Sequence, residues 1–174
     1  MIRNGFIDLR TRVMLGAAAC ASTALSALAQ EVPANCELGT ADDPARQILS
    51  CDDGLVIEAE AAARLGIIEG EARSFTLEGG AALVQVASGQ GPQQIRTPHA
   101  IAAVRGTLYA VDATQTATSV FVQEGSVGVS PLERAGDGVV LGAGEGVDVT
   151  PGAALEANTW SAARVAELMA RFGR

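Results

Sequence analysis

One residue of the chain could act as a general base near neutral pH, and nothing beside it in the sequence supports that role. His99 is the single histidine among 174 residues, and it directly follows Pro98. A pair of histidine metal ligands is therefore excluded, and a Ser-His-Asp arrangement would have to use this residue. The sequence also lacks the Gly-x-Ser-x-Gly pattern that exposes a nucleophilic serine. We expect His99 to be structural and the protein not to be an enzyme.

Three other patterns could carry chemistry. Residues 142–146, Gly-Ala-Gly-Glu-Gly, resemble a dinucleotide loop, but they lead into another strand-like run and lack the third glycine at the required place. The pairs Asp42-Asp43 and Asp52-Asp53 could gather around calcium, yet no EF-hand or nonapeptide spacing is present. One tryptophan and one tyrosine offer few stacking platforms for a sugar. The sequence therefore predicts no cofactor and favours solvated acidic turns over a metal site.

The N-terminus has the pattern of a secretory signal peptide. Its basic part consists of Arg3, Arg10 and Arg12. Residues 13–28 are apolar or small, and Ala27-Leu28-Ala29 is a small-x-small cleavage pattern. We therefore expect a cleavable signal peptide over residues 1–29, a mature start near Gln30, and a location in the periplasm of a Gram-negative bacterium.

Alternatives to simple cleavage stay open. Ala17-Ala18-Ala19-Cys20 resembles a lipobox with alanine in place of the usual leucine, so a lipoprotein is one alternative and a secreted protein is another. A membrane anchor is disfavoured because a bilayer span needs about 20 apolar residues. The stretch 13–28 is shorter than that and contains polar side chains. We expect no membrane insertion of the mature chain.

Two cysteines, Cys36 and Cys51, remain after the predicted cleavage. The periplasm oxidises thiols, so we expect a disulfide between them. Closing a loop of this length would stabilise the fold by roughly 3 kcal/mol in the chain-entropy account. A redox-active pair would instead show Cys-x-x-Cys spacing, which is not the spacing here.

The charge of the mature chain disfavours two classes of partner. The whole chain has 12 basic and 20 acidic residues. Removing residues 1–29 takes away three arginines and Asp8, which leaves 9 basic and 19 acidic residues, a formal charge of −10. Every remaining basic residue is arginine, and no basic stripe is visible. We expect neither nucleic acid nor a membrane surface to be a partner.

Short β-type runs separated by glycine-containing turns fill the chain from residue 73 to residue 149, which favours an all-β fold. The runs are Arg73–Leu77, Ala82–Val86, Gln94–Thr97, Thr107–Val111, Ser119–Val122, Ser126–Val129, Val139–Leu141 and Val147–Val149. Their spacing and alternation are typical of a sandwich, a roll or a β-solenoid-like fold. Residues 56–68 contain helix formers, but their β-branched ends favour strand.

The C-terminal residues predict a short helix. Asn158 could cap it, and an apolar stripe at helical spacing follows. The stripe consists of Val165, Leu168, Met169 and Phe172. We expect this stripe to pack on the parent sheet.

Four successive motifs carry a resemblance to a known family. They are Ile95-Arg96-Thr97-Pro98-His99-Ala100, the segment Ala103 to Val111 around Arg105-Gly106-Thr107, the segment Val122 to Val129 around Glu124-Gly125, and Val140 to Glu145. In this order they resemble the FecR domain family, with Glu124-Gly125 similar to a hairpin turn. We expect the motif residues Thr97, Pro98, Arg105, Gly106, Thr107, Glu124 and Gly125 to be structural.

The resemblance implies a domain organisation and a function. After the signal peptide we expect a disulfide-bearing segment 30–54, a FecR-like β domain 55–151, and a linker with the C-terminal helix 152–174. The resemblance implies a periplasmic binding or sensory module that contacts envelope proteins. The alternative is a structural envelope protein that self-associates. Sigma-factor control is not carried over, because here the domain directly follows a signal peptide.

Overall fold

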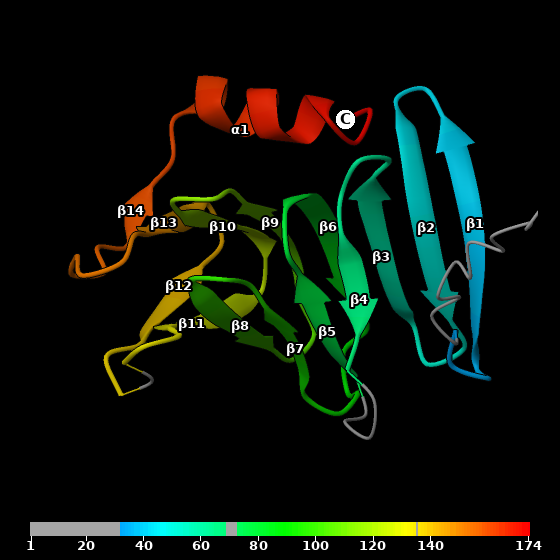
Figure 1. Ribbon diagram of the computed structural model, residues 1–174, viewed down its shortest axis with the longest axis horizontal. Helices are drawn as coiled ribbons and strands as arrows, with labels where there is room; N and C mark the ends of the chain where they lie inside the picture. The colour runs from blue at the N-terminus through cyan, green and yellow to red at the C-terminus, as the bar shows by residue number, and fades with distance from the viewer. Residues whose placement is uncertain (1–31, 69–72, 135) are drawn as a thin grey trace, which may run out of the picture.

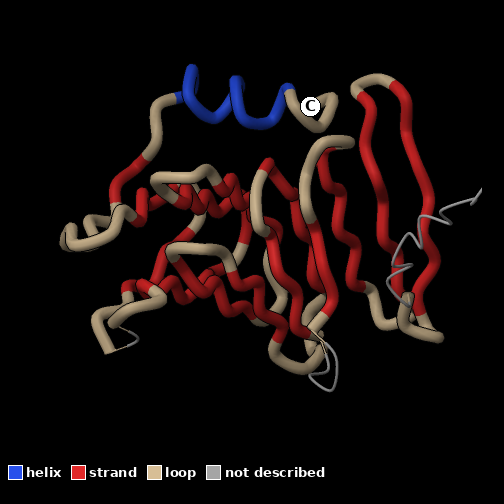
Figure 2. Tube along the Cα trace, in the orientation of Figure 1, coloured by secondary structure: helices blue, strands red, loops and turns tan. Residues whose placement is uncertain are grey.

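The computed structural model describes residues 32–68, 73–134 and 136–174, so the predicted signal peptide lies outside the described residues. Within these ranges the chain forms short strands and one C-terminal helix (Figure 2). The strands are β1 Cys36–Asp42, β2 Ala45–Cys51, β3 Leu55–Glu60, β4 Leu65–Ile67, β5 Ser74–Leu77, β6 Gly80–Val86, β7 Gln93–Arg96, β8 Ala100–Val104, β9 Leu108–Ala113, β10 Thr118–Glu124, β11 Ser126–Pro131, β12 Val139–Gly142, β13 Glu145–Val149 and β14 Asn158–Thr159. The helix is α1, Ala162–Ala170.

These strands form two sheets that pack against each other (Figure 1). Sheet A has the order β1-β2-β3-β6-β9-β10-β13-β14, and sheet B has the order β12-β11-β8-β7-β5-β4. Neighbouring strands are antiparallel except for β5 and β7, which run parallel. The predicted all-β sandwich is confirmed.

The core between the sheets comes from alternate residues of both. Val120 and Val122 of β10 face Val127 and Val129 of β11 within one buried cluster, and all four are fully buried. β-branched side chains on alternate positions suit this arrangement, because a strand directs every second residue to the same face. The buried Tyr109 hydroxyl donates to Gln93 Oε1 at 2.9 Å, so a hydrogen bond also joins β9 of sheet A to β7 of sheet B.

Several connections carry the chain from one sheet to the other at a sharp corner. The β8–β9, β10–β11 and β12–β13 connections each join strands of different sheets. The interpretation of Glu124-Gly125 as a hairpin is therefore wrong: β10 pairs with β9 and β13, whereas β11 pairs with β8 and β12. A Glu-Gly turn reverses or redirects the chain equally well, so its residues alone did not distinguish a corner from a hairpin.

The N-terminal strands form a regular hairpin that extends sheet A. β1 and β2 pair over all seven positions of β1, from Cys36 opposite Cys51 to Asp42 opposite Ala45. The predicted disulfide between Cys36 and Cys51 is confirmed. β2 in turn pairs with β3, whose residues begin the 56–68 segment for which strand was predicted. The strand expectation for that segment holds over β3 and β4.

The C-terminal helix covers the outer face of sheet A (Figure 1). Leu168, Met169 and Phe172 pack with Leu83 of β6 and Phe121 of β10 in a second buried cluster. Packing of the predicted apolar stripe on the parent sheet is thus confirmed. Covering this face explains why β6 and β10 carry apolar residues on both sides, since Leu83 and Phe121 on their outer faces are buried beneath the C-terminal segment.

The start of the helix differs from the prediction. Asn158 lies in β14, and the N-cap is Ser161, whose hydroxyl accepts from the Arg164 amide at 3.3 Å. Asparagine and serine are both favourable N-cap residues, so residue type alone did not predict which of the two caps the helix. Trp160 stacks on Phe121 and lies against Gly146, where an added Cβ would collide with the indole ring. This contact fixes the chain at Trp160, and the helix begins just after it.

Candidate functional site

The motif residues lie at two ends of the sandwich, and most of them contact other parts of the same chain. Thr107 is buried and its hydroxyl donates to the Ser126 carbonyl at 2.9 Å, which joins the β8–β9 corner to the β10–β11 corner. Gly106 and Gly125 both have positive φ, 68° and 86°. A Cβ on Gly125 would lie 2.7 Å from the Gly106 carbonyl oxygen. The two corners therefore pack backbone to backbone, which only glycine permits at this position.

Thr97 and Pro98 lie at the opposite end, in the β7–β8 turn. Thr97 is buried, and its hydroxyl accepts from the Ala100 amide at 2.9 Å and lies 2.8 Å from the Thr118 hydroxyl. Because Thr118 begins β10 of sheet A, this pair joins the two sheets. Pro98 is exposed at the tip of the turn.

Arg105 and Glu124 differ from the other motif residues because they contact little. Both are exposed. Neither side chain has a hydrogen bond or ion pair with a described residue. Their corners are fixed by glycine and threonine, so the two charged side chains are free to meet another molecule.

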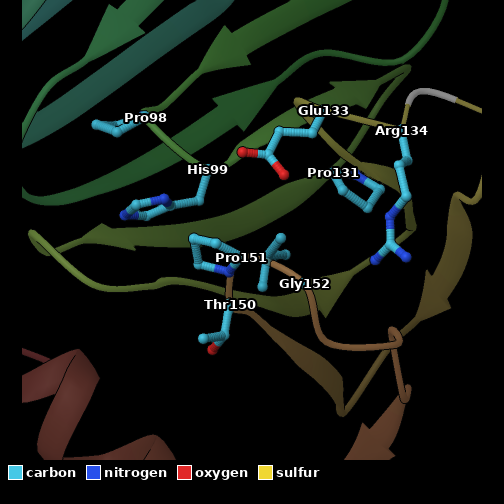
Figure 3. A pocket seen from close by; sticks show the side chains of 9 residues that line it. Pro98, His99, Pro131, Glu133, Arg134, Thr150, Pro151 and Gly152 are labelled. Carbon is cyan, nitrogen blue, oxygen red and sulfur yellow. The ribbon is translucent and has the colours of Figure 1, made fainter.

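A small cleft surrounds His99 (Figure 3). In this view Pro98, Pro151 and the Glu133 carboxylate lie around the imidazole, and Pro131 and Arg134 lie beyond Glu133. His99 Nε2 is buried without a hydrogen-bond partner among the described residues. The cavity measures about 20 Å³, which is room for about one water molecule. The cleft is too small for an organic substrate, and a water molecule would satisfy the imidazole.

The described residues contain neither a candidate metal-binding group nor a helix that could span a membrane. Within residues 32–68, 73–134 and 136–174, no group of three or more histidine, cysteine or acidic side chains could hold a metal ion. The pairs Asp42-Asp43 and Asp52-Asp53 thus do not gather into such a group. No helix in the same ranges is long and apolar enough to cross a bilayer.

Charged side chains fasten α1 to sheet A. Arg171 donates from Nε and Nη2 to the Glu60 carboxylate at 2.6 and 2.7 Å, and from Nη1 to Asp112 at 2.6 Å. Arg164 pairs with Asp148 at 2.5 Å and lies over the Trp160 ring, 3.5 Å from its centre. A groove of about 200 Å³ lies between these groups. Asp112, Arg164 and Arg171 line this groove and are paired within the chain, so these three side chains serve helix attachment first.

These ion pairs shift two carboxyl pKa values downward. Hydrogen bonds from Arg171 hold the pKa of Glu60 below its ordinary value of 4.5, against a smaller opposing effect of burial. Burial alone would raise the pKa of Asp148, but hydrogen bonds from Arg164 and Ser119 outweigh it and lower that pKa. Both groups are partly exposed, so salt screens their pairs.

Glu60→Gln is expected to change how stability depends on pH. A carboxyl whose pKa is lowered by folding stabilises the protein above its unfolded pKa, and this stabilisation is lost as pH falls through the folded pKa. The variant should therefore be less stable than the parent at pH 7, and the difference should shrink below pH 4.5. Urea unfolding between pH 7 and pH 3 measures both effects. Glu78→Gln, at an exposed residue without an ion pair among the described residues, should show no such convergence.

The edge of sheet A at β1 is open along its length. Of the described strands only β2 pairs with β1, and most β1 residues are exposed. The Asp52 amide donates to the Asn35 carbonyl at 2.9 Å, which makes that pair a hydrogen-bonded one. Pairs alternate in an antiparallel ladder, so Cys36, Leu38 and Thr40 belong to non-hydrogen-bonded pairs and direct their backbone groups away from β2. The Cys36 amide donates to the Pro33 carbonyl at 2.8 Å, which leaves the amides of Leu38 and Thr40 for another strand. β1 therefore offers outward N–H and C=O groups to another strand.

Natural edge strands are usually protected, and β1 shows little protection. It contains no lysine and no proline, and its register with β2 has no bulge. Its only charges are Glu37 and Asp42, near the two ends. We call the outward backbone of residues 36–42 the β1 edge. It is a ready template for strand addition.

Comparison with known proteins assigns the chain to a family. A family model described as FecR protein matches residues 37–128, more than half of the 174 residues. The chain belongs to the FecR family. The match runs from β1 into β11 and includes the Thr97-Pro98, Arg105-Gly106-Thr107 and Glu124-Gly125 motifs, so the resemblance found in the sequence is confirmed.

Solved structures share the fold of this FecR-family chain. Two crystal structures of a "putative anti-sigma factor" from Parabacteroides distasonis ATCC 8503 match with TM-scores of 0.55 and 0.58. Their identities are 24% and 22%, and the matches cover 74% and 75% of this chain. The chain spans 58% and 62% of the lengths of those two chains. Among curated proteins, none matches this chain.

Proposed function

We propose that this FecR-family chain is an exported sensory or regulatory module of the periplasm that binds another envelope protein and performs no catalysis. The observation that carries the proposal is the β1 edge, seven residues long and unpaired on its outer side among the described strands. Family membership and the fold shared with a "putative anti-sigma factor" support a regulatory role rather than a catalytic one.

The mode of binding follows from the backbone geometry. A partner strand laid beside β1 would exchange hydrogen bonds with the outward groups of Leu38 and Thr40. Main-chain bonds would supply much of the affinity, and exposed side chains such as Leu38, 60% exposed, would supply selectivity. The disulfide at the end of β1 holds the hairpin together while its edge is occupied.

Proline at position 40 tests this mode of binding. The Thr40 amide points away from β2, so Thr40→Pro removes an outward donor while the β1–β2 ladder keeps its bonds. The matched control, Thr40→Val, changes the same exposed side chain but keeps the amide. We expect the mature protein, residues 30–174, to retain one envelope protein from periplasmic and membrane fractions. Binding of that protein should fall at least tenfold for Thr40→Pro and stay within twofold for Thr40→Val.

The outcomes separate this proposal from the alternative. Equal binding by Thr40→Pro and Thr40→Val would refute strand addition at β1. Oligomers that form with rising concentration, disappear in Thr40→Pro and retain no other protein would instead favour the structural, self-associating alternative. Sedimentation of both variants measures this, and thermal unfolding verifies that both are folded.

A further inference from the structure

The outer face of sheet B is uncovered, in contrast to that of sheet A. α1 lies across sheet A, whereas no described helix lies across the other side of the sandwich (Figure 1). On β8, the buried residues Ala100, Ala102 and Val104 alternate with Ile101 and Ala103, which therefore point outward. The pairing partners of those two on β7 and β11 point outward as well.

Small and uncharged side chains dominate this surface, which we call the sheet B face. It includes Gln94 and Arg96 on β7, Ile101 and Ala103 on β8, Arg105 directly after β8, Ser126, Gly128 and Ser130 on β11, and Val140 on β12. Val140 is 73% exposed, and no acidic residue is among these nine. Short side chains keep the face flat, so another molecule could approach the strands closely.

Two arginines on this face have no ion-pair or hydrogen-bond partner among the described side chains. Seven of the nine arginines in the described ranges make an ion pair or donate a hydrogen bond. These are Arg46, Arg64, Arg73, Arg134, Arg164, Arg171 and Arg174. Arg96 and Arg105 have neither among the described residues, and Arg96 Nε is buried without an acceptor. The chain has about two acidic residues per basic one, yet no acidic residue in the described ranges pairs with these two arginines.

The contrast with sheet A indicates what would cover this face. On sheet A the strands present Glu60, Asp112 and Asp148, and the covering segment brings Arg164 and Arg171. The outer face of sheet B presents arginines instead, so a surface complementary to it would present carboxylates. Arg105 lies four positions beyond Ile101, the partner of Arg96, which separates the two Cα atoms by roughly 14 Å.

We propose that the sheet B face docks an acidic surface of a second protein, with carboxylates at Arg96 and Arg105 and apolar contact over Ala103, Gly128 and Val140. A protein surface fits better than an anionic lipid or polysaccharide. Those polyanions select many clustered cations, whereas this face has two widely spaced ones around an uncharged centre. The face belongs to the other sheet from the β1 edge, so the inference goes beyond the function proposed above.

A designed peptide tests whether the sheet B face binds a strand that carries two carboxylates. The probe is an extended twelve-residue peptide of alternating valine and threonine with two glutamates four positions apart, about 13 Å in a strand. Its control has glutamine in place of both glutamates. Titrated into ¹⁵N-labelled residues 30–174 at low salt, the glutamate peptide is expected to shift the amide signals of Ala103 and Gly128 and to bind at least fivefold more tightly than the glutamine peptide.

Variants assign the binding to the two arginines. Arg96→Gln with Arg105→Gln should remove the preference for the glutamate peptide. Arg134→Gln changes an exposed arginine that pairs with Asp137 outside this face and should leave the preference intact. The amide spectra themselves verify folding of each variant. Equal binding of both peptides, shifts that map elsewhere, or stronger arginine-dependent binding to vesicles of phosphatidylglycerol and phosphatidylethanolamine would each overturn the proposal. Thr40→Pro should not affect peptide binding here, so this test and that of the β1 edge fail independently.

Discussion

Phe172→Ala is expected to lower the free energy of unfolding by about 3 to 5 kcal/mol, the usual cost of deleting a large buried aromatic side chain. Phe172 is 1% exposed and packs in the cluster beneath the C-terminal segment with Leu83 and Phe121. Its loss leaves a cavity between α1 and sheet A, and the segment would detach more readily. Chemical denaturation followed by circular dichroism and by Trp160 fluorescence measures the change.

A matched control separates burial from loss of apolar character in general. Val140→Ala removes apolar atoms from a side chain that is 73% exposed, and it should change stability by less than about 0.5 kcal/mol. If Phe172→Ala unfolded at the same denaturant concentration as Val140→Ala, the packing of the C-terminal segment on sheet A would be contradicted.

Gly125→Ala is expected to cost about 2 to 5 kcal/mol. Positive φ accounts for about 1 to 2 kcal/mol of that in any residue with a Cβ, and overpacking adds about 1 to 3 kcal/mol. The added methyl would lie 2.7 Å from the Gly106 carbonyl oxygen and 3.2 Å from the Thr107 Cα, neither of which can rotate away. Urea unfolding of the purified variant measures the loss.

Gly144 offers the control for this second prediction. It has a φ of 84°, close to the 86° of Gly125, and it also lies at a corner between the sheets. A Cβ there would meet nothing within 4 Å. Gly144→Ala should therefore show the backbone cost alone, and the difference between the two variants isolates corner packing. Equal losses would show that the corners do not pack against each other as described.

Strand positions were predictable because the signal is local. Runs such as Ser119–Val122 alternate β-branched and other residues between glycine turns. Each predicted run overlaps a strand of the structure, and only Arg73, Thr97 and Thr107 fall one residue outside. The sheet to which each strand belongs was not predictable. Glu124-Gly125 carries the same turn chemistry in a hairpin and in a corner, and the choice depends on packing against Gly106 and Thr107, which are distant in sequence.

The N-terminal hairpin escaped a strand prediction for a related reason. β1, Cys-Glu-Leu-Gly-Thr-Ala-Asp, has few β-branched residues and no buried face, so neither propensity nor alternation marks it. Pairing with β2 and the disulfide define it instead. The interaction surfaces could not be predicted from the sequence either, because they depend on which charged side chains form ion pairs in the folded chain. Arg171 pairs with Glu60, more than a hundred residues earlier, whereas Arg96 finds no partner among the described residues.

Attachment of residues 160–174 decides whether part of sheet A is exposed. Leu83, Ala110 and Phe121 form an apolar surface on sheet A, and among the described residues Trp160, Leu168, Met169 and Phe172 cover it. A chain released before Trp160 would still contain every strand of the core between the sheets, yet it would expose this surface. Such fragments would adhere to chaperones or to one another, and proteases could remove them. Residues 160–174 therefore protect this surface from non-specific association and from proteolysis.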